Sequence, residues 1–336
     1  MSVLSLTERR AAPAWPSKGV RVSDSAGILS GRLLVVAFEG WNDAGEAASG
    51  AVRNLKEQLA LYPIAEVDSE EYFDFQFNRP VTSQDEDGNR LLVWPTVTMY
   101  GPTSQRKKKA KRIAEDAQLT MSGDNGSNVY LLLGTEPSRG WKTFTSEIMA
   151  AIREVHITGI IFLGAMLADV PHTRPISVFV TSENAAVRKQ LGVERSGYEG
   201  PVGILSVLGI AAEAAGIPTV SIWASVPHYV HNAPSPKATL AIIDKLEELI
   251  DVVIPRGELV TESAAWESGI NALAGDDEDM AAYIAQLEAA RDTVDSPEAS
   301  GEAIAQEFER YLRKRDGGRD PGRADGKPDE PWRPKE

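Results

Sequence analysis

One loop of the sequence, ADVPHTRP at 168–175, holds an acid, an imidazole and a guanidinium close together. Asp169, His172 and Arg174 can bind an anion or carry a proton, and the two prolines would hold the loop stiff. The alternative is a structural turn in which Asp169 orients His172 or Arg174. Both interpretations place the three side chains just after a buried strand.

A second loop places two histidines around a tyrosine, in the order His228, Tyr229 and His231. Two imidazoles at this spacing can share one metal ion. Zinc needs a third ligand, which Asp169 or His172 would supply only if the two loops converge. A histidine pair in a proline-rich loop is more often structural, so we expect no metal site.

The first predicted strand is followed by GWNDAG at 40–45, which has the glycine spacing of a phosphate-binding loop. Glu46 stands where that loop requires lysine, and its carboxylate would repel phosphate. A nucleoside-triphosphate loop is therefore excluded. Asp43 then caps the following helix or acts as a base.

Polar side chains of this kind follow four predicted strands at the point where each strand ends. The candidates for binding a ligand or partner are Glu39, Trp41, Asn42, Asp43, Glu136, Arg139, Asp169, His172, Arg174, His228 and Tyr229. Ligands of open parallel sheets bind beyond the carboxyl ends of the strands, so these residues form one candidate site. The alternative is that they cap helices, satisfy turns and fill a subunit contact. We assign none of them a catalytic role.

The elements that must position these side chains lie between residues 31 and 255. Apolar runs predict strands at 33–38, 72–77, 91–100, 129–134, 157–164, 177–182 and 218–226, and helical periodicity predicts helices near 44–59, 144–155, 202–215 and 242–250. Strands that alternate with helices imply a mainly parallel sheet with helices on both faces. The predicted fold class is α/β.

The strand signal stops after Pro255. Residues 256–315 predict three helices, at about 257–273, 277–291 and 298–315, and hold 14 acidic and six basic residues of a chain whose net charge is −14. We expect an all-helical subdomain there, which the acidic excess marks as an interaction surface. Residues 316–336, rich in Gly and Pro, predict a disordered tail, and residues 1–30 predict an N-terminal arm.

Composition excludes several classes of protein. The 336 residues include no cysteine, which excludes a disulfide framework, a thiolate zinc site and a cysteine nucleophile. The acidic excess argues against binding to nucleic acid or to an anionic membrane. The sequence has no export signal and no apolar run of membrane-spanning length, so we expect a cytoplasmic protein.

Known catalytic motifs give no further lead. The sequence has neither the Gly-x-Ser-x-Gly elbow of serine hydrolases nor a Gly-x-Gly-x-x-Gly after the first strand, and we expect no cofactor. The basic run RKKKAKR at 106–112 contacts an anionic partner or forms a solvated helix or loop.

Six segments occur in an order that resembles the proteasome assembly chaperone 2 family, in its bacterial branch. They are FEGWNDAGEAASGAV at 38–52, DFQFNRP at 74–80, LLGTEPSRGWKTF at 132–144, GAMLADVPHTRP at 164–175, YEGPVGI at 198–204 and WASVPHYVHNAPSPKA at 223–238. The resemblance covers about 33–250. It implies a three-layer α/β core similar to nucleoside phosphorylases, followed by an added helical subdomain. The bacterial branch has no established activity.

The resemblance also implies a class of partner. Family members that assist proteasome assembly bind the ring of α-subunits through a C-terminal tripeptide of a hydrophobic residue, tyrosine and any residue. This sequence ends in Pro334, Lys335 and Glu336. Proteasome subunits are thus the implied partners, but docking through that tripeptide is not expected.

Two functions are consistent with these observations. The first is a proteasome-assembly-chaperone-like protein that acts through protein–protein contacts without catalysis and self-associates as a dimer or trimer. The alternative is an enzyme or small-molecule binder. Its loop cluster would hold an anion or nucleoside-type ligand through Arg139 and Arg174, with Asp43, Glu136 or His172 in acid–base chemistry. A single concave pocket uniting Asp43, Glu136, Asp169, His172 and Arg174 would favour the alternative.

Overall fold

The computed structural model describes residues 4–5, 29, 31–85, 87–102, 128–250 and 253–293. Most of the predicted N-terminal arm, the basic run at 106–112, the predicted helix at 298–315 and the predicted tail lie outside these residues.

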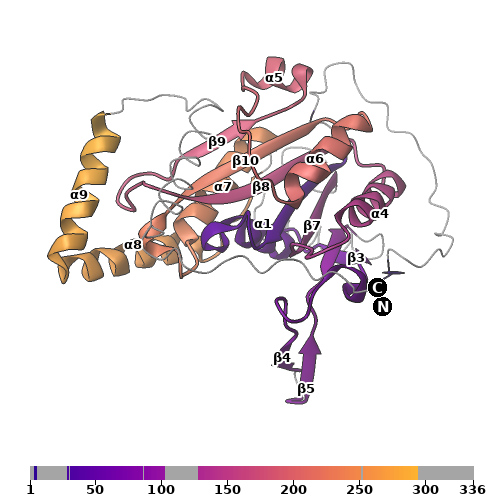
Figure 1. Cartoon of the computed structure of the whole chain (residues 1–336), viewed down its shortest axis with the longest axis horizontal. Helices are drawn as coiled ribbons and strands as arrows, with labels where there is room; N and C mark the ends of the chain where they lie inside the picture. Colours follow the sequence, from indigo (N-terminus) through magenta and orange to yellow (C-terminus); the bar gives the residue numbers. More distant parts are fainter. Residues whose placement is uncertain are drawn as a thin grey trace, which may run out of the picture.

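A mixed sheet forms the centre of the molecule (Figure 1). Its eight strands have the order β1–β3–β6–β7–β2–β8–β10–β9. Their bounds are β1 Leu4–Ser5, β2 Leu33–Glu39, β3 Tyr62–Glu66, β6 Val97–Gly101, β7 Val129–Thr135, β8 Gly159–Ala168, β9 Val178–Thr181 and β10 Thr219–Pro227. The four central strands β7, β2, β8 and β10 are parallel, while β6 and β9 flank them antiparallel. This arrangement confirms the predicted α/β fold.

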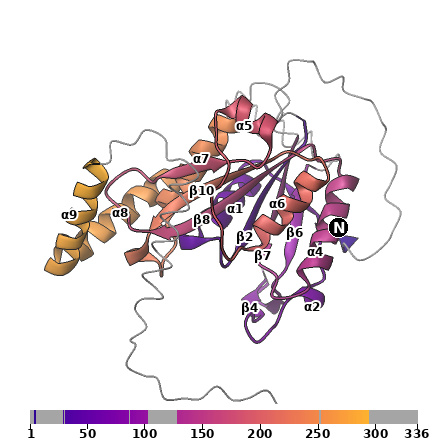
Figure 2. The ribbon, with the colours of Figure 1, turned by 45° about the horizontal axis from the view of Figure 1, so that its top comes forward.

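Helices cover both faces of the sheet, which makes three layers (Figure 2). Helices α1 (Ala47–Gln58) and α7 (Pro236–Ile250) pack on one face, and α4 (Trp141–Glu154) and α6 (Ile204–Ala214) pack on the other. The side chains of a strand point alternately to its two faces, so β2 supplies Val35 to one core and Val36 to the other. This double burial explains why β2 is apolar throughout.

The predicted strand at 72–77 is wrong. A short helix, α2 (Ser69–Tyr72), ends there, and a turn follows in which the Asp74 carboxylate accepts a hydrogen bond from the Gln76 amide at 2.9 Å. Tyr72 and Phe73 are both buried, although adjacent strand residues would face opposite sides. The prediction failed because the aromatic residues around this turn have the same alternating spacing in the sequence as those of a half-buried strand.

The predicted strand at 91–100 is in fact two strands, separated around Pro95. Strand β6 joins the central sheet, whereas β5 (Arg90–Val93) pairs only with β4 (Val81–Gln84) in a separate two-stranded hairpin. Proline has no amide hydrogen for a sheet ladder and is therefore found where a strand ends. The hairpin projects from the body of the molecule (Figure 1).

Up to residue 293, where the described part of the chain ends, two helices follow the last strand and its helix. Helix α8 (Leu259–Gly275) packs against α7, and α9 (Glu278–Thr293) packs against α8 at one end of the sheet (Figure 1). Their buried apolar residues are Leu259, Ile270, Ala274, Ile284 and Leu287. Within the residues that the structure describes, no helix has the length and apolar character to cross a membrane.

Candidate functional site

The turn after β2 occupies the crevice where an open α/β sheet would hold a ligand. Strands β2 and β8 pair from Leu33 to Val36 and then separate. The turn fills the gap, because Asp43 forms a bridge to β8 at Ala165 and the Ala165 amide donates to the Asn42 carbonyl at 2.8 Å. After β2 and after β8 the chain continues toward opposite edges of the sheet. In open α/β sheets, ligands usually bind between two strands whose connections diverge in this way.

The side chain of Asp43 caps the N-terminus of α1 from a distance, since Glu46 occupies the N-cap position itself. Its Oδ1 accepts hydrogen bonds from the amides of Ala48 at 2.9 Å and Ser49 at 3.0 Å, both in the first turn of the helix. The first amides of a helix have no partner within the helix, so a carboxylate here satisfies them and meets the positive end of the dipole. Burial raises the pKa of Asp43, and its hydrogen bonds oppose that shift.

The Glu136 carboxylate likewise accepts a hydrogen bond from the N-terminus of α6, on the opposite face of the sheet. Its Oε1 accepts from the Ile204 amide at 2.7 Å, and the Trp41 amide donates to the same carboxylate. Burial raises the pKa of Glu136 as well.

Asn42 and Gly203 lie in contact beside these two caps. A Cβ added to Gly203 would lie 2.0 Å from Asn42 Nδ2 and 2.8 Å from Glu136 Oε1, so only glycine fits there. Asn42 is 5% exposed, and its Nδ2 has no hydrogen-bond partner among the described residues. We call Asn42, Asp43, Glu136 and Gly203 the edge cluster.

Two further predicted residues, Glu39 and Arg139, bind neighbouring helices through an ion pair and through hydrogen bonds. Glu39 forms an ion pair with Arg53 of α1, and its Oε2 accepts from Thr135 Oγ1 at 3.3 Å. Arg139 donates to the carbonyls of Glu70 at 2.7 Å and Glu71 at 3.3 Å, in α2. Its guanidinium therefore binds main-chain oxygen at that helix.

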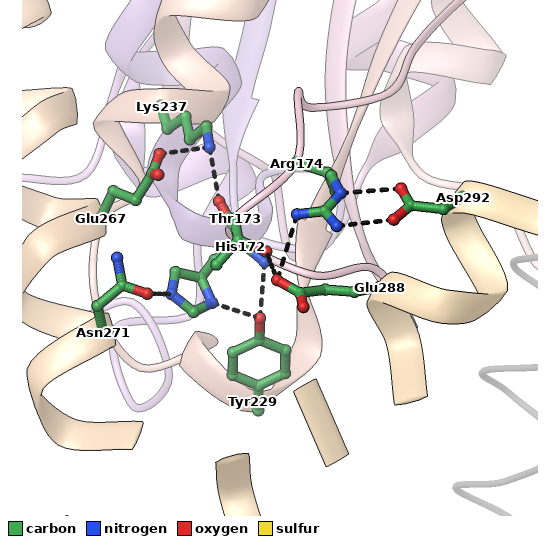
Figure 3. Close-up of polar contacts among 9 residues, drawn as sticks. All are labelled: His172, Thr173, Arg174, Tyr229, Lys237, Glu267, Asn271, Glu288 and Asp292. Carbon is green, nitrogen blue, oxygen red and sulfur yellow. Dashed lines mark hydrogen bonds and ion pairs between the residues drawn. The ribbon is translucent and has the colours of Figure 1, made fainter. Parts of the chain in front are cut away.

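His172 connects the loop after β8 to two other segments (Figure 3). Its Nδ1 lies 2.8 Å from the Tyr229 hydroxyl, and its Nε2 lies 3.0 Å from Asn271 Oδ1 of α8. Asn271 Oδ1 can only accept, so in the neutral imidazole Nε2 carries the proton and Nδ1 accepts from the Tyr229 hydroxyl, which itself accepts from the His172 amide at 2.7 Å. The imidazole is fully buried and neutral, and burial lowers its pKa.

Arg174 binds α9 (Figure 3). Its Nε and Nη2 donate to the two carboxylate oxygens of Asp292 at 2.9 and 2.7 Å, and its Nη1 reaches Glu288 at 3.3 Å. These charged hydrogen bonds raise the pKa of Arg174 and lower that of Asp292. Lys237 of α7 adds a third link, since its Nζ bonds the His172 carbonyl at 2.6 Å and Glu267 of α8 at 2.5 Å.

Asp169 and His228 complete this group. His228 Nδ1 lies 3.2 Å from Asp169 Oδ1, which also accepts from the Tyr283 hydroxyl of α9 at 3.3 Å. His231 instead bonds the His228 carbonyl through Nδ1 at 2.8 Å. In the described parts of the chain, no three His, Asp or Glu side chains are grouped as metal ligands. We call Asp169, His172, Arg174, His228 and Tyr229 the helix anchor.

Apart from Glu39, Trp41 and Arg139, the predicted site residues therefore fall into two groups with different partners. Asp43 and Glu136 hold α1 and α6 within the core, whereas Asp169, His172 and Arg174 hold α8 and α9. The partners Asn271, Glu288 and Asp292 were not predicted, because nothing local in a sequence pairs a loop with a helix about a hundred residues away.

A groove of about 490 Å³ lies elsewhere, between α1, the loop before α7 and the start of α8. Both arginines on its wall are neutralised: Arg53 pairs with Glu39 and Glu46, and Arg256 pairs with Asp244 and Glu247. Glu57, Glu258 and Glu262 also line it, so its charge disfavours an anion.

Next to the edge cluster lies an apolar surface of which the sequence prediction included only Trp41. Ile210 of α6 is 70% exposed, Val202 is 47% exposed and Trp41 is 47% exposed. Trp41 and Val202 directly precede Asn42 and Gly203, which touch each other. The signal was present in the sequence, because Ser206 and Glu213 are the only polar residues of α6 (ILSVLGIAAEA), fewer than a surface helix usually has. We call Trp41, Val202, Val207 and Ile210 the α6 surface.

The fold and these contacts define a three-layer α/β protein in which polar loops at one edge of the sheet hold helices in place. The chain belongs to the PAC2 family, whose model matches residues 37–274. A PAC2 family protein from Streptomyces avermitilis is 40% identical, with a TM-score of 0.63 over 75% of this chain and 99% of that one.

A proteasome-assembly chaperone homologue from Mycobacterium tuberculosis is 39% identical, with a TM-score of 0.62 over 75% of this chain and 99% of its own. A protein of unknown function from the same organism is 23% identical and has a TM-score of 0.68 over 91% of this chain and 99% of that one, which shows a shared fold. A search of curated proteins finds no match.

Proposed function

We propose that the protein is a cytoplasmic assembly chaperone of the proteasome type, which binds partner subunits through the α6 surface and catalyses no reaction. Membership of the PAC2 family supports the proposal, as does the similar structure of the proteasome-assembly chaperone homologue from Mycobacterium tuberculosis. The partner class is a proteasome subunit that exposes a complementary apolar patch before it is assembled.

The observation that carries the proposal is the exposed, largely apolar face of α6. Its stripe of exposed and half-exposed residues is Ser206, Val207, Ile210, Glu213 and Ala214. Glu213 is the one acid, and both its carboxylate oxygens are used within the chain, by Asn184 at 3.0 Å and by Thr219 at 2.7 Å. Glu213 lies near the C-terminal end of the stripe, so a partner centred on Ile210 can leave this carboxylate at the rim of the contact.

Burial of this face contributes part of the free energy of a contact with a client. Covering a fully exposed aliphatic side chain contributes about 1.5–3 kcal/mol, and an aromatic anchor such as Trp41 contributes on a similar scale. Trp41, Val202 and Ile210 are partly exposed and contribute less than this, so the contact must extend to surface around them to offset the entropy of association.

The anchoring of the charged residues also favours protein contacts over the anion-binding alternative. Arg174 is held by two carboxylates and Arg139 by two carbonyls. An anion would have to displace those carboxylates before it could pair with Arg174, while Arg139, already bonded to main-chain oxygen, offers only an exposed contact.

The test is an assembly assay with purified α- and β-subunits of a 20S proteasome. Peptidase activity is followed as particles form, with and without the protein, and binding to isolated α-subunits is measured in parallel. We expect the protein to bind α-subunits and to change the rate of assembly. Ile210→Glu should abolish both effects, because it places a charge in the centre of the apolar face.

The matched control is Leu273→Glu on α8. Leu273 is 66% exposed, so the substitution adds the same charge at an equally exposed apolar position outside the α6 surface. Leu273→Glu should behave as the unmodified protein. Absence of binding by the unmodified protein, or equal losses in the two variants, would contradict the proposal.

A further inference from the structure

Helix α9 is held on one side and exposed on the other. Ile284 and Leu287 are buried, and the side chains of Tyr283 and Glu288 bind the loop after β8. The period of 3.6 residues per turn places these four side chains on one side of the helix. The exposed residues between 281 and 290 belong to the other side, and we call them the alanine face: Ala281, Ala282, Ala285, Gln286, Ala289 and Ala290.

The alanine face carries no charge, unlike the outer side of an ordinary surface helix. Ala282, Ala285 and Ala289 follow each other at spacings of three and four residues, which is the spacing of the contact line between two packed helices. Alanine is small, so a second helix can approach closely and fill the space with larger apolar side chains. The alanine face therefore fits a helix that carries a stripe of large apolar residues.

The chain continues past α9 with a segment of that kind. The predicted helix at 298–315, outside the described residues, carries an apolar stripe at helical spacing: Ile304, Phe308, Tyr311 and Leu312. Ser296 and Pro297 are residue types that begin helices, at the N-cap and at the first helical position. A single amphipathic helix is marginally stable in water, so the stripe needs a surface to cover it.

Only residues 294–297 separate α9 from the predicted helix. Helices joined by so short a connection lie side by side and antiparallel. Helix α9 has 16 residues and the predicted helix is of similar length, so the two can cover each other from end to end. In a hairpin that turns at 294–297, Phe308 falls beside Ala282 and Ala285 of the alanine face, and Ile304 falls one turn closer to the connection.

The charges at the far end of such a hairpin are complementary. The exposed residues just before α9 and in its first turn are all acidic: Asp276, Asp277, Glu278 and Asp279. None of them forms an ion pair with another described residue. The last residues of the predicted helix are mainly basic, and they include Arg310, Arg313, Lys314 and Arg315. The antiparallel arrangement brings these bases to the acidic residues, which identifies the segment at 298–315 as the occupant of the alanine face.

We propose that residues 298–315 form a helix that packs antiparallel on the alanine face of α9. The helical part of the chain is then a layer of three helices, with α9 between α8 and the helix at 298–315. The ion pairs of Arg174 with Glu288 and Asp292 of α9 then attach two helices to the body of the molecule through one contact. This layer forms within one chain, and client binding by the α6 surface does not depend on it.

Hydrogen exchange of the full chain tests the proposal, with Ala285→Glu as the disrupting variant. In the unmodified protein we expect the amides of residues 304–312 to exchange at least tenfold more slowly than those of residues 316–336. Ala285→Glu should remove this protection, because it places a charge in the centre of the alanine face. Glutamate is a good helix former, so α9 itself should stay helical. Ala265→Glu, at an exposed alanine of α8, is the matched control and should leave exchange at 304–312 unchanged.

Substitutions within the predicted helix test the same contact from its other partner. Phe308→Ala should speed exchange at 304–312 at least tenfold, because it removes the largest side chain of the stripe. Glu309→Ala is the matched control, since residue 309 lies about 100° further round the helix than Phe308, on the side away from α9. It should leave the exchange rates unchanged.

The absence of cysteine gives a direct test of the register. Oxidised glutathione, which takes up the two electrons and two protons, should form a disulfide between Ala285→Cys and Ile304→Cys in one chain. The control pairs Ala285→Cys with Glu309→Cys, which point in different directions, and should be linked at least tenfold more slowly.

Exchange at 304–312 as fast as at 316–336 in the unmodified protein would overturn the proposal. Protection that persists in Ala285→Glu would do so too, because the segment would then cover another surface, as would equal rates of linkage in the two cysteine pairs.

Discussion

The edge cluster and the helix anchor lie at the same edge of the sheet but stabilise the protein in different ways. In the edge cluster, buried carboxylates bind the main-chain amides at the ends of α1 and α6. In the helix anchor, side chains bind side chains of α8 and α9, and the guanidinium of Arg174 is about one-third exposed. The first group is therefore part of the core, and the second attaches a layer to it.

The difference predicts how each group responds when it is damaged. A buried amide that loses its acceptor costs the full desolvation of that group, whereas exposed ion pairs contribute little to global stability. Damage to the edge cluster should unfold the core, and damage to the helix anchor should loosen only the helices.

The largest effect is expected from Gly203→Ala. The new Cβ would lie 2.0 Å from Asn42 Nδ2 and cannot be accommodated without shifting the edge cluster. We expect the free energy of unfolding, measured by urea denaturation, to fall by about 3 kcal/mol. Gly209→Ala in the same helix is the control: its Cβ would meet only Phe162 at 3.5 Å, and it should stabilise α6 by about 1 kcal/mol. Equal changes in the free energy of unfolding for Gly203→Ala and Gly209→Ala would contradict the tight contact at Gly203.

Asp43→Ala should follow, with a loss of about 2 kcal/mol in the free energy of unfolding, because two amides of α1 lose their acceptor. Asp43→Asn keeps an oxygen in place and should lose much less. Urea denaturation of both variants compares them. If Asp43→Asn proves as unstable as Asp43→Ala, the negative charge rather than the hydrogen bonds matters.

Arg174→Gln should loosen the attachment of the C-terminal helices and leave the core unchanged. Loss of the paired hydrogen bonds to Asp292 should speed hydrogen exchange in α9, while exchange in the central strands stays the same. Arg195→Gln, which removes an exposed ion pair with Glu183, is the matched control and should leave α9 unchanged. Faster exchange in β2 or β8 of Arg174→Gln would show that the helix anchor also supports the core.

The smallest effect is on the pH dependence of the free energy of unfolding, and its sign differs between the helix anchor and the edge cluster. Because burial lowers the pKa of His172 below its ordinary 6.5, the unfolded chain takes up that proton first, and stability falls as pH drops below about 6.5. The pKa values of Asp43 and Glu136 are raised, so protonation of those groups favours the folded state. The dependence of the unfolding free energy on pH between 7.5 and 5.5 should be shallower in His172→Gln. An unchanged slope would contradict this assignment.

The central fold was predictable because buried strands and amphipathic helices are local signals. The apolar run at β2 and the periodicity of α1 can each be read within a dozen residues. The errors lie where local patterns mislead: Tyr72 and Phe73 imitate a strand at a turn, and Pro95 divides one apolar run between two sheets.

The candidate site was predictable in composition but not in arrangement. The polar residues do gather at the carboxyl edge, since chain direction alone determines where loops follow parallel strands. Their division into two groups depends on where α6, α8 and α9 pack, and those contacts join residues far apart in the sequence. The pairing of Arg174 with Asp292 has no local signature.

The central claim, that partners bind the α6 surface and not the polar loops, is tested most directly by hydrogen exchange of the protein with and without isolated proteasome α-subunits. The account predicts slower exchange in residues 202–214 and in the turn around Trp41, with exchange in the loops at 169–174 and 228–231 unchanged. Protection of those two loops with none in α6 would contradict it.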